Sequence, residues 1–379
     1  MLTIAFIAGL SDTKLSQKLA PLQALPSVLR IDLYRRAAFV GDKIRWISVP
    51  QWHLMPVVVA EMIRVAKLLM NGWRYDVVIG CHQTYHGVWA WLAGAVWRKP
   101  VIQMIIGSVD RAYASRLLRF VVKHASACAV RGPLSVAALR ARGYTGPIEI
   151  LHNVYNADSK NFSSEKFYDF IVVANYAKAK DFPWLIHVLT ELKALRRGPM
   201  SDVRDPLCLQ QLDHSPSPDA PTQGRTDAPF HAALCGRDLE KNLAAAVAAA
   251  GLSSCITFLG HCDAVQLERL YASSRIMLLT SRTEGMPMAA IEAMAYGLPV
   301  CATHVGELPW LVRDGHDGIL FAHGDTKAAL HALTKLLKDR QRCDQFGKNA
   351  RARFVELQSQ FAIQSIMQSW ERLFRTFIL

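Results

Sequence analysis

The segment Ser281-Arg-Thr-Glu-Gly-Met-Pro-Met-Ala-Ala-Ile-Glu-Ala-Met-Ala-Tyr-Gly297 is the most informative stretch of this chain. The run before it, Arg275 to Thr280, is short and mostly apolar, which is typical of a buried strand. Pro287 suits the first position of a helix, and Gly297 suits the position that closes one. The segment therefore predicts a strand, then a loop, then a helix.

The loop before this predicted helix is suited to binding a phosphate. A helix N-terminus presents free backbone N–H groups and the positive end of the helix dipole, and a glycine lets the backbone approach a ligand closely. Glu292 lies five residues beyond Pro287, which places it roughly 7 Å further along the helix axis. This is comparable to the reach from a diphosphate to a ribose. The expected contacts at the helix start are Gly285, Met286, Pro287 and Met288.

Two carboxylates, Glu284 and Glu292, flank this helix start. A carboxylate only accepts hydrogen bonds, so Glu292 is expected to hold two ribose hydroxyls while Glu284 contacts a sugar. The alternative is two solvated carboxylates, the usual state of glutamate in proteins. Spacing alone does not decide between these interpretations.

The residues that follow, Gly297-Leu-Pro-Val-Cys-Ala-Thr-His-Val-Gly-Glu-Leu-Pro-Trp-Leu-Val-Arg-Asp-Gly-His-Asp-Gly-Ile-Leu-Phe321, favour the ligand-binding interpretation. Together with the first segment they resemble the retaining glycosyltransferases of family 4. The signature of that family is EGxPxxxxEAMAxGxPV followed by G(G/E)xPExxxDGxxGxL. The resemblance implies an α/β protein of the GT-B type, in which two Rossmann-like, doubly wound domains face each other across a cleft.

A second motif of that family is only partly present. After the first strand of the second domain, family members show an Arg and then a Lys, both of which hold the donor diphosphate. Lys180 falls where the Lys belongs, but Asn175 takes the position of the Arg. A neutral amide cannot replace a guanidinium fork on phosphate. Lys178 could compensate, or it could simply be a solvated lysine. The resemblance thus gives catalytic roles to Glu284 and Lys180 and places Asn175 in the donor site.

The first half of the chain departs further from the family. Gly9 stands in the loop after the first strand, where relatives often carry two glycines, and Ile106 stands where many relatives carry a histidine. Asp110 belongs to a Gly-Ser-Val-Asp segment that is similar to a variant found in part of the family. It is a candidate for contacts with sugar hydroxyls, and a role as a helix N-cap is equally supported.

Histidine spacing does not predict a metal site. His82 and His86 are four residues apart, but no carboxylate completes a ligand set. His86 is expected to line the cleft, as a similar His-Gly segment does in relatives, and the alternative is the capped start of a helix. No nucleophile elbow, P-loop or dinucleotide fingerprint is present, which disfavours hydrolases, phosphotransferases and dehydrogenases.

Length and composition indicate a two-domain globular protein. The chain has 379 residues, of which 51% are hydrophobic, and we expect it to be cytoplasmic because it has neither a transmembrane run nor a basic leader. The cysteines are scattered without CxxC pairs, so buried, reduced thiols are expected. They are Cys81, Cys128, Cys208, Cys235, Cys255, Cys262, Cys301 and Cys343.

Positive charge is concentrated in the first half. Residues 1–165 carry 20 Lys and Arg against 9 Asp and Glu, a net of +11, and the rest carries 24 against 22, a net of +2. Basic residues alternate with apolar ones in 110–124, where the cations are Arg111, Arg116, Arg119 and Lys123. This pattern fits a helix on an anionic membrane surface, or a packed helix with a solvated basic face. No nucleic-acid-binding module is recognised.

Alternating strand and helix patterns occur in two sets, which predicts two parallel sheets covered by helices. We expect an N-terminal domain over 1–160, a nucleotide-sugar-binding domain over 161–358 with a flexible surface insertion at 197–229, and a C-terminal helix at 359–379 that returns to the first domain. The first set of strands is predicted at 2–8, 28–33, 43–49, 76–81, 101–106, 125–130 and 148–152, and helices are predicted between several of them, near 56–71, 85–96, 111–123 and 134–142.

The resemblance implies metal-independent, cofactor-free transfer of a hexose-type sugar, with retention, from a nucleoside-diphosphate sugar to a saccharide acceptor. UDP is favoured over GDP. The basic first half favours a lipid-linked acceptor at the inner face of the cytoplasmic membrane, in assembly of a bacterial surface polysaccharide or glycolipid. The alternative, motivated by Asn175 and Ile106, is an inactive scaffold or partner subunit. An epimerase or phosphorylase is disfavoured because their basic or cofactor-binding sites are not recognised.

Overall fold

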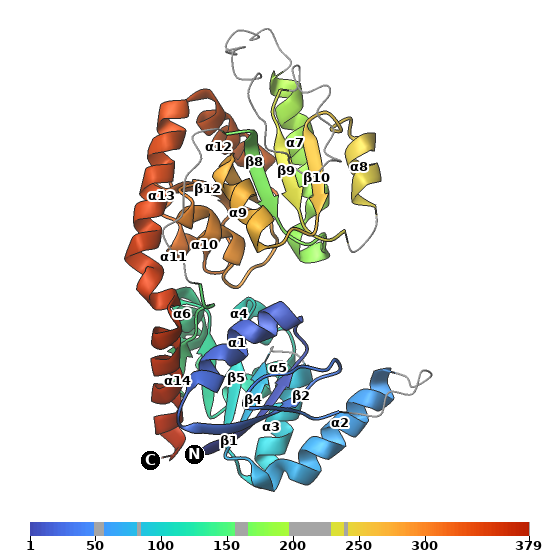
Figure 1. The fold of residues 1–379 in the computed structure, drawn as a ribbon, viewed down its shortest axis with the longest axis vertical. Helices are drawn as coiled ribbons and strands as arrows, with labels where there is room; N and C mark the ends of the chain where they lie inside the picture. The colour runs from blue at the N-terminus through green and yellow to red at the C-terminus, as the bar shows by residue number, and fades with distance from the viewer. Residues whose placement is uncertain (49–56, 82–84, 156–165, 197–228, 239–241, 379) are drawn as a thin grey trace.

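Two parallel sheets, each wrapped by helices, make up the chain (Figure 1). The structure is a computed structural model and describes residues 1–48, 57–81, 85–155, 166–196, 229–238 and 242–378. The predicted α/β fold class with two doubly wound domains is confirmed. The predicted insertion at 197–229 lies outside the described residues except for its last one.

The N-terminal sheet has the strand order β3-β2-β1-β4-β5-β6-β7, and all of its pairings are parallel. Strands β2 and β3 lie on one side of β1, and β4 to β7 lie on the other, so the strand order switches between β1 and β4. In such folds ligands bind at the carboxyl ends of the strands beside this switch point. The strands are β1 (Leu2–Ala8), β2 (Val28–Tyr34), β3 (Ile44–Trp46), β4 (Val77–Cys81), β5 (Val101–Met104), β6 (Ala127–Val130) and β7 (Ile148–Ile150).

Helices cover both faces of this sheet, which is why its central strands are continuous apolar runs. The helices are α1 (Asp12–Ala24), α2 (Val57–Asn71), the 3-10 turn η1 (Gly72–Arg74), α3 (Tyr85–Trp97), α4 (Val109–Ala112), α5 (Arg116–Lys123) and α6 (Pro133–Ala141).

The C-terminal sheet has the order β10-β9-β8-β11-β12-β13, also parallel throughout. Its strands are β8 (Tyr168–Val173), β9 (Ala232–Cys235), β10 (Ile256–Gly260), β11 (Ser274–Leu279), β12 (Val300–Thr303) and β13 (Gly318–Phe321). Its helices are the 3-10 turn η2 (Lys178–Lys180), α7 (Phe182–Arg196), α8 (Leu243–Ala249), α9 (Ala264–Ala272), α10 (Met288–Ala295), α11 (Leu308–Leu311), α12 (Thr326–Lys338) and α13 (Arg340–Phe361).

The C-terminal helix α14 (Ile363–Ile378) packs on the N-terminal domain, against α1 and β7 (Figure 1). Its apolar face, which includes Trp370 and Leu373, belongs to the same buried cluster as the first strands. Outside that cluster, the Arg372 guanidinium donates two hydrogen bonds, of 3.0 and 2.9 Å, to the Glu149 carboxylate at β7. The chain therefore ends in the domain where it began.

In the N-terminal domain, two helical segments differ from the predictions. The helix predicted over 111–123 is two short helices, α4 and α5, because the Ser115 hydroxyl accepts a hydrogen bond from the Leu118 N–H at 3.2 Å and starts a new helix there. Helix α1 was not predicted, although Leu15, Leu19 and Leu22 recur at helical spacing and are fully buried. Pro21 inside this helix weakens the sequence pattern.

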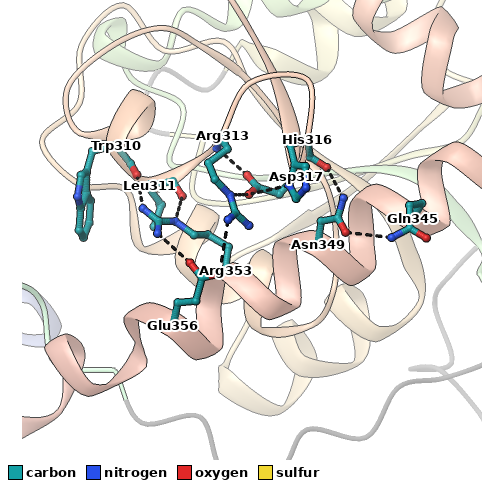
Figure 2. Close-up of polar contacts among 9 residues, drawn as sticks. All are labelled: Trp310, Leu311, Arg313, His316, Asp317, Gln345, Asn349, Arg353 and Glu356. Atoms are coloured by element: carbon teal, nitrogen blue, oxygen red, sulfur yellow. Dashed lines mark hydrogen bonds and ion pairs between the residues drawn. The ribbon is translucent and has the colours of Figure 1, made fainter.

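A polar network ties the segment after α11 to the long helix α13 (Figure 2). The fully buried Asp317 carboxylate accepts hydrogen bonds from the backbone N–H and the Nε of Arg313, at 2.7 and 2.6 Å. From α13, Arg353 donates to two backbone carbonyls at the end of α11, and Asn349 donates to a carbonyl of the segment. Residues 310–317 are thus held to α13 by hydrogen bonds from Asn349 and Arg353.

Candidate active site

Lys180 and Glu284 are 104 residues apart in the chain, and their side chains form an ion pair. Lys180 ends the turn η2 after β8, and Glu284 lies in the loop after β11. The pair forms because β8 and β11 are neighbours and parallel, so both loops leave the same edge of the sheet. The Lys180 Nζ donates to the Glu284 Oε1, and the Ser281 Oγ donates to the same oxygen at 2.7 Å. The Glu284 side chain is 10% exposed and that of Lys180 is 25% exposed, so neither is fully buried.

Backbone contacts hold these two loops together. The Arg282 N–H donates to the Ala179 carbonyl at 2.9 Å, and the Thr280 hydroxyl donates to the Lys180 carbonyl at 3.3 Å. From the next strand, the Thr303 hydroxyl donates to the Ser281 carbonyl at 2.7 Å. The geometry of the Lys180–Glu284 pair is therefore set by the sheet edge as well as by the charges.

Asn175, at the position of the family's Arg, supports the neighbouring backbone. Its side-chain carbonyl accepts a hydrogen bond from the Arg237 N–H at 3.0 Å, across the ends of β8 and β9. The backbone packs closely here, since a Cβ on Gly236 would collide with the carbonyl of Ala174. Arg237 is an exposed cation beside Asn175 that the sequence analysis missed. The sequence feature that could have indicated Arg237 is its position directly after an apolar run and a glycine, where a strand ends and a loop begins.

Helix α10 begins beside the ion pair. Pro287 is the residue before the helix rather than its first residue, because its ψ of 120° is extended. Met286 is buried, and Gly297 has a φ of +69° where the helix ends. Gly285 meets the other domain: a Cβ at this position would collide with the carbonyl oxygen of Ile106, after β5. A glycine is therefore required where this loop contacts the N-terminal domain.

Glu292, in the middle of α10, forms a hydrogen bond within its own domain. Its Oε2 accepts a hydrogen bond from the Tyr271 hydroxyl of α9 at 2.8 Å. Burial, followed by the nearby Glu292 charge, raises the pKa of Tyr271 well above its usual value, so the phenol stays protonated and can donate. Glu292 also has a further interaction, so its carboxylate belongs to a polar network.

On the N-terminal side, Gly9 and His86 come together at the carboxyl ends of β1 and β4. A Cβ on Gly9 would lie 2.5 Å from the His86 Cε1, so the imidazole rests against the glycine backbone. His86 is buried in the first turn of α3, next to the Tyr85 ring. His82, the other histidine of the spacing considered above, lies outside the described residues.

Asp110 does not cap a helix. The residue before α4 is Ser108, and Asp110 lies within the first turn of the helix, where the positive end of the helix dipole favours a carboxylate. The N-cap prediction for Asp110 was therefore wrong. Its carboxylate is exposed and forms an ion pair with Arg142, at the end of α6.

The two domains also meet at Glu307, a residue that the sequence analysis did not single out. Glu307 precedes α11 in the C-terminal domain and is 1% exposed. Its carboxylate accepts hydrogen bonds from the backbone N–H groups of Leu134 and Ser135, at 3.0 and 2.8 Å, and from the Ser135 hydroxyl at 2.6 Å. In the sequence, Glu307 stands out only because it matches the second position of the family signature, which is Gly or Glu.

Metal-ligating groups do not gather in the part of the chain that the structure describes. No set of three or more His, Cys, Asp and Glu side chains there is arranged to hold a metal ion.

None of the described helices is long and apolar enough to cross a membrane.

The chain is similar to known glycosyltransferases in part of its sequence and in its fold. Residues 219–353 match the family model described as "Glycosyl transferases group 1". The match includes Glu284 and Glu292 but excludes Lys180 and the whole N-terminal domain. A solved structure from Anabaena, of Alr3699/HepE in complex with UDP and glucose, aligns with a TM-score of 0.70 over 99% of this chain and 100% of that one, at 16% sequence identity. The chain has the GT-B fold.

Curated relatives match over about a third of the chain or less. The N-acetyl-alpha-D-glucosaminyl L-malate synthase of Bacillus anthracis is 34% identical over 119 residues, which are 31% of this chain and 30% of that protein. The lipopolysaccharide core biosynthesis mannosyltransferase of Rhizobium meliloti is 33% identical over 139 residues, 35% of this chain and 39% of that protein. The matched stretches thus span less than half of either relative.

Proposed function

We propose that this chain is a glycosyltransferase that moves a hexose-type sugar from a nucleoside-diphosphate sugar to a saccharide acceptor. The observation that carries the proposal is the Lys180–Glu284 pair beside the start of α10. One cation, one carboxylate and a helix N-terminus lie at the carboxyl ends of neighbouring strands, where doubly wound folds bind ligands. They match a diphosphate and the sugar attached to it.

The reaction needs stabilisation of a leaving nucleoside diphosphate and of a sugar with oxocarbenium character. Lys180 and the N–H groups at the start of α10 would hold the diphosphate, while Glu284 would accept hydrogen bonds from the sugar. The bond from the sugar C1 to the phosphate oxygen breaks, and a bond from C1 to the acceptor oxygen forms. The acceptor hydroxyl proton passes to the departing phosphate. Because acceptor and leaving group then share one face of the sugar, we propose retention.

UDP is proposed as the nucleotide in preference to GDP, and a surface polysaccharide or glycolipid as the product. Support for UDP comes from the Anabaena structure, whose title names UDP and glucose. Support for the product comes from the Rhizobium relative, which is named for lipopolysaccharide core biosynthesis. A thermal-shift screen with UDP, GDP and dTDP tests this choice, because a ligand that binds the folded state raises its melting temperature. Stabilisation by GDP alone would refute it.

We further propose that transfer needs neither a metal ion nor an organic cofactor. Lys180 and the helix N-terminus would supply the positive charge that a metal supplies in other glycosyltransferases. Activity should then survive EDTA at a concentration well above that of any contaminating metal. Complete loss in EDTA, restored by Mg²⁺ or Mn²⁺, would refute metal independence.

A peripheral position on the inner face of the cytoplasmic membrane, with a lipid-linked acceptor, is proposed from helix α5. Leu117 and Phe120 are exposed on this helix beside the exposed cations Arg116, Arg119 and Lys123. Exposed apolar side chains among cations are suited to anionic lipid head groups. The acceptor would then reach the cleft from the membrane.

The second candidate function is a binding partner without activity. Asn175 favours it, because its side-chain carbonyl supports the Arg237 backbone and an amide gives no positive charge to a diphosphate. Release of a nucleoside diphosphate from a panel of donors separates the two functions. Binding of UDP without any release, from every donor offered together with saccharide acceptors, would favour the scaffold.

A further inference from the structure

We propose that Glu307 is a positioning residue that fixes the N-terminal domain against the donor-side loop at 284–285. This inference rests on the proposed function, because it concerns the alignment of an acceptor-side domain with a donor site. The Glu307 carboxylate binds the first turn of α6, and its backbone N–H binds the Gly285 carbonyl. It acts through the contacts described below.

The first contact crosses between the domains. The Glu307 carboxylate accepts three hydrogen bonds from the first turn of α6, two from backbone N–H groups and one from the Ser135 hydroxyl. A helix N-terminus is the favoured site for a negative charge, and here another domain supplies that charge. Gly132 makes the approach possible, since a Cβ at this position would collide with the Glu307 carboxylate.

The second contact runs from Glu307 to the donor-side loop. The Glu307 N–H donates to the Gly285 carbonyl at 2.8 Å. The preceding Gly306 has a φ of +59°, and a Cβ there would lie 2.5 Å from the carbonyl oxygens of both Glu284 and Gly285. The side chain of one residue therefore caps α6 while its backbone holds the loop that carries Glu284.

Loss of the Glu307 contact should therefore affect nucleotide binding and turnover differently. The groups proposed to hold the nucleotide all lie in the C-terminal domain, so losing the cap should not weaken nucleotide binding. The sugar transfer needs both domains, and a displacement of about 1 Å in a reacting group can cost 100-fold in rate. Glu307 should therefore affect kcat while it spares the affinity for UDP.

Glu307→Gln tests this difference, because one amide oxygen cannot accept all three hydrogen bonds and the amide NH₂ would face N–H donors. We expect its Kd for UDP, by calorimetry, to stay within twofold of wild type and its kcat for UDP release to fall at least tenfold. Glu191→Gln, which changes an exposed carboxylate on α7, is the matched control and should leave both values unchanged. An unchanged kcat in folded Glu307→Gln would overturn the proposal.

Gly132→Ala attacks the same contact from the other domain. The φ of Gly132 is −174°, an extended backbone that alanine adopts readily, so its effect should come from the clash with Glu307 alone. We expect the same loss of kcat as in Glu307→Gln. Gly132→Ala combined with Glu307→Ala should be no worse than Glu307→Ala, because the two changes remove one interaction. Additive losses would contradict the proposal.

A disulfide between positions 132 and 307 should restore the kcat that is lost when the Glu307 contact is removed. A Cβ at Gly132 would lie 2.9 Å from the Glu307 Cγ, so the Cβ atoms of Gly132→Cys and Glu307→Cys would be at most about 4.4 Å apart, close enough for a disulfide to join them. The reduced double variant should be slow and the oxidised one fast, while oxidant leaves wild type unchanged. A slow oxidised form would overturn the proposal.

The same variants separate failure of this inference from failure of the proposed function. If wild type releases a nucleoside diphosphate from no donor of the panel, the proposed function fails, and X-ray scattering still tests whether Glu307→Gln loosens the arrangement of the domains. If wild type is active and Glu307→Gln is equally active, only the role of Glu307 fails.

Discussion

At the residue scale, the two carboxylates that flank the start of α10 are predicted to have different roles. Glu292→Ala should weaken UDP binding by about tenfold, the scale of one charge-assisted hydrogen bond, because Glu292 is expected to hold the ribose. Glu284→Ala should leave the Kd for UDP unchanged and impair turnover, because Glu284 is expected to hold the sugar. Calorimetry with UDP and a kinetic assay measure these effects.

Tyr271→Phe is the matched control for Glu292, because it removes the 2.8 Å hydrogen bond to that carboxylate and leaves the charge in place. Its UDP affinity should stay within a few fold of wild type. Equal losses of UDP affinity in Glu284→Ala and Glu292→Ala would contradict the separate assignments.

The sequence indicated individual residues better than it indicated their partners. Glu284 and Lys180 could be singled out because each occupies a motif position, but their ion pair depends on the neighbouring places of β8 and β11 in the sheet. Glu307 could not be predicted, because the groups that its carboxylate binds lie 172 and 173 residues away. A capping carboxylate from another domain leaves no local pattern.

At the scale of elements, helix α5 carries the membrane proposal and its test. The protein should sediment with anionic liposomes at low salt, and Arg116→Glu combined with Arg119→Glu should abolish sedimentation without reducing UDP affinity. Each basic residue near an anionic surface contributes about 1 kcal/mol, and salt screens that attraction. Wild-type protein that ignores anionic liposomes at low ionic strength would favour a soluble acceptor.

The apolar pattern predicted the first strand well but missed a break between two helices. The buried strands of a parallel sheet are continuous apolar runs, and β1 (Leu2–Ala8) was predicted with the bounds observed. The break between α4 and α5 was missed because apolar spacing continues through it, whereas Ser115, the residue that starts the second helix, gives only a local signal. Such caps depend on one hydrogen bond and are easily outweighed by a periodic pattern.

At the scale of the whole molecule, the junction between the domains should make stability depend on pH. His152 is buried, stacks on Trp310 of the other domain at 5.5 Å, and contacts the Phe361 ring at the end of α13. Burial lowers the pKa of His152 from 6.5 to about 4. The folded protein therefore favours neutral His152, and stability is lost as the pH falls from about 6.5 towards 4.

Between pH 7 and pH 5 this loss should amount to about 2 kcal/mol for His152. His152→Phe keeps a ring against Trp310 and removes the titration. The free energy of unfolding in urea should therefore fall less over this pH range in the variant than in wild type. Equal falls in the two proteins would show that His152 does not titrate in this way.

The most direct test of a nucleotide-sugar site at the Lys180–Glu284 pair is the rate of UDP release from a panel of UDP-sugars, in the presence of saccharide acceptors. We predict release from at least one donor by wild type and a loss of about 100-fold or more in Lys180→Met, because the variant lacks the cation that stabilises the leaving diphosphate. Circular dichroism checks that Lys180→Met is folded. Undiminished release by a folded Lys180→Met, or no release and no UDP binding by wild type, would contradict the assignment of this site.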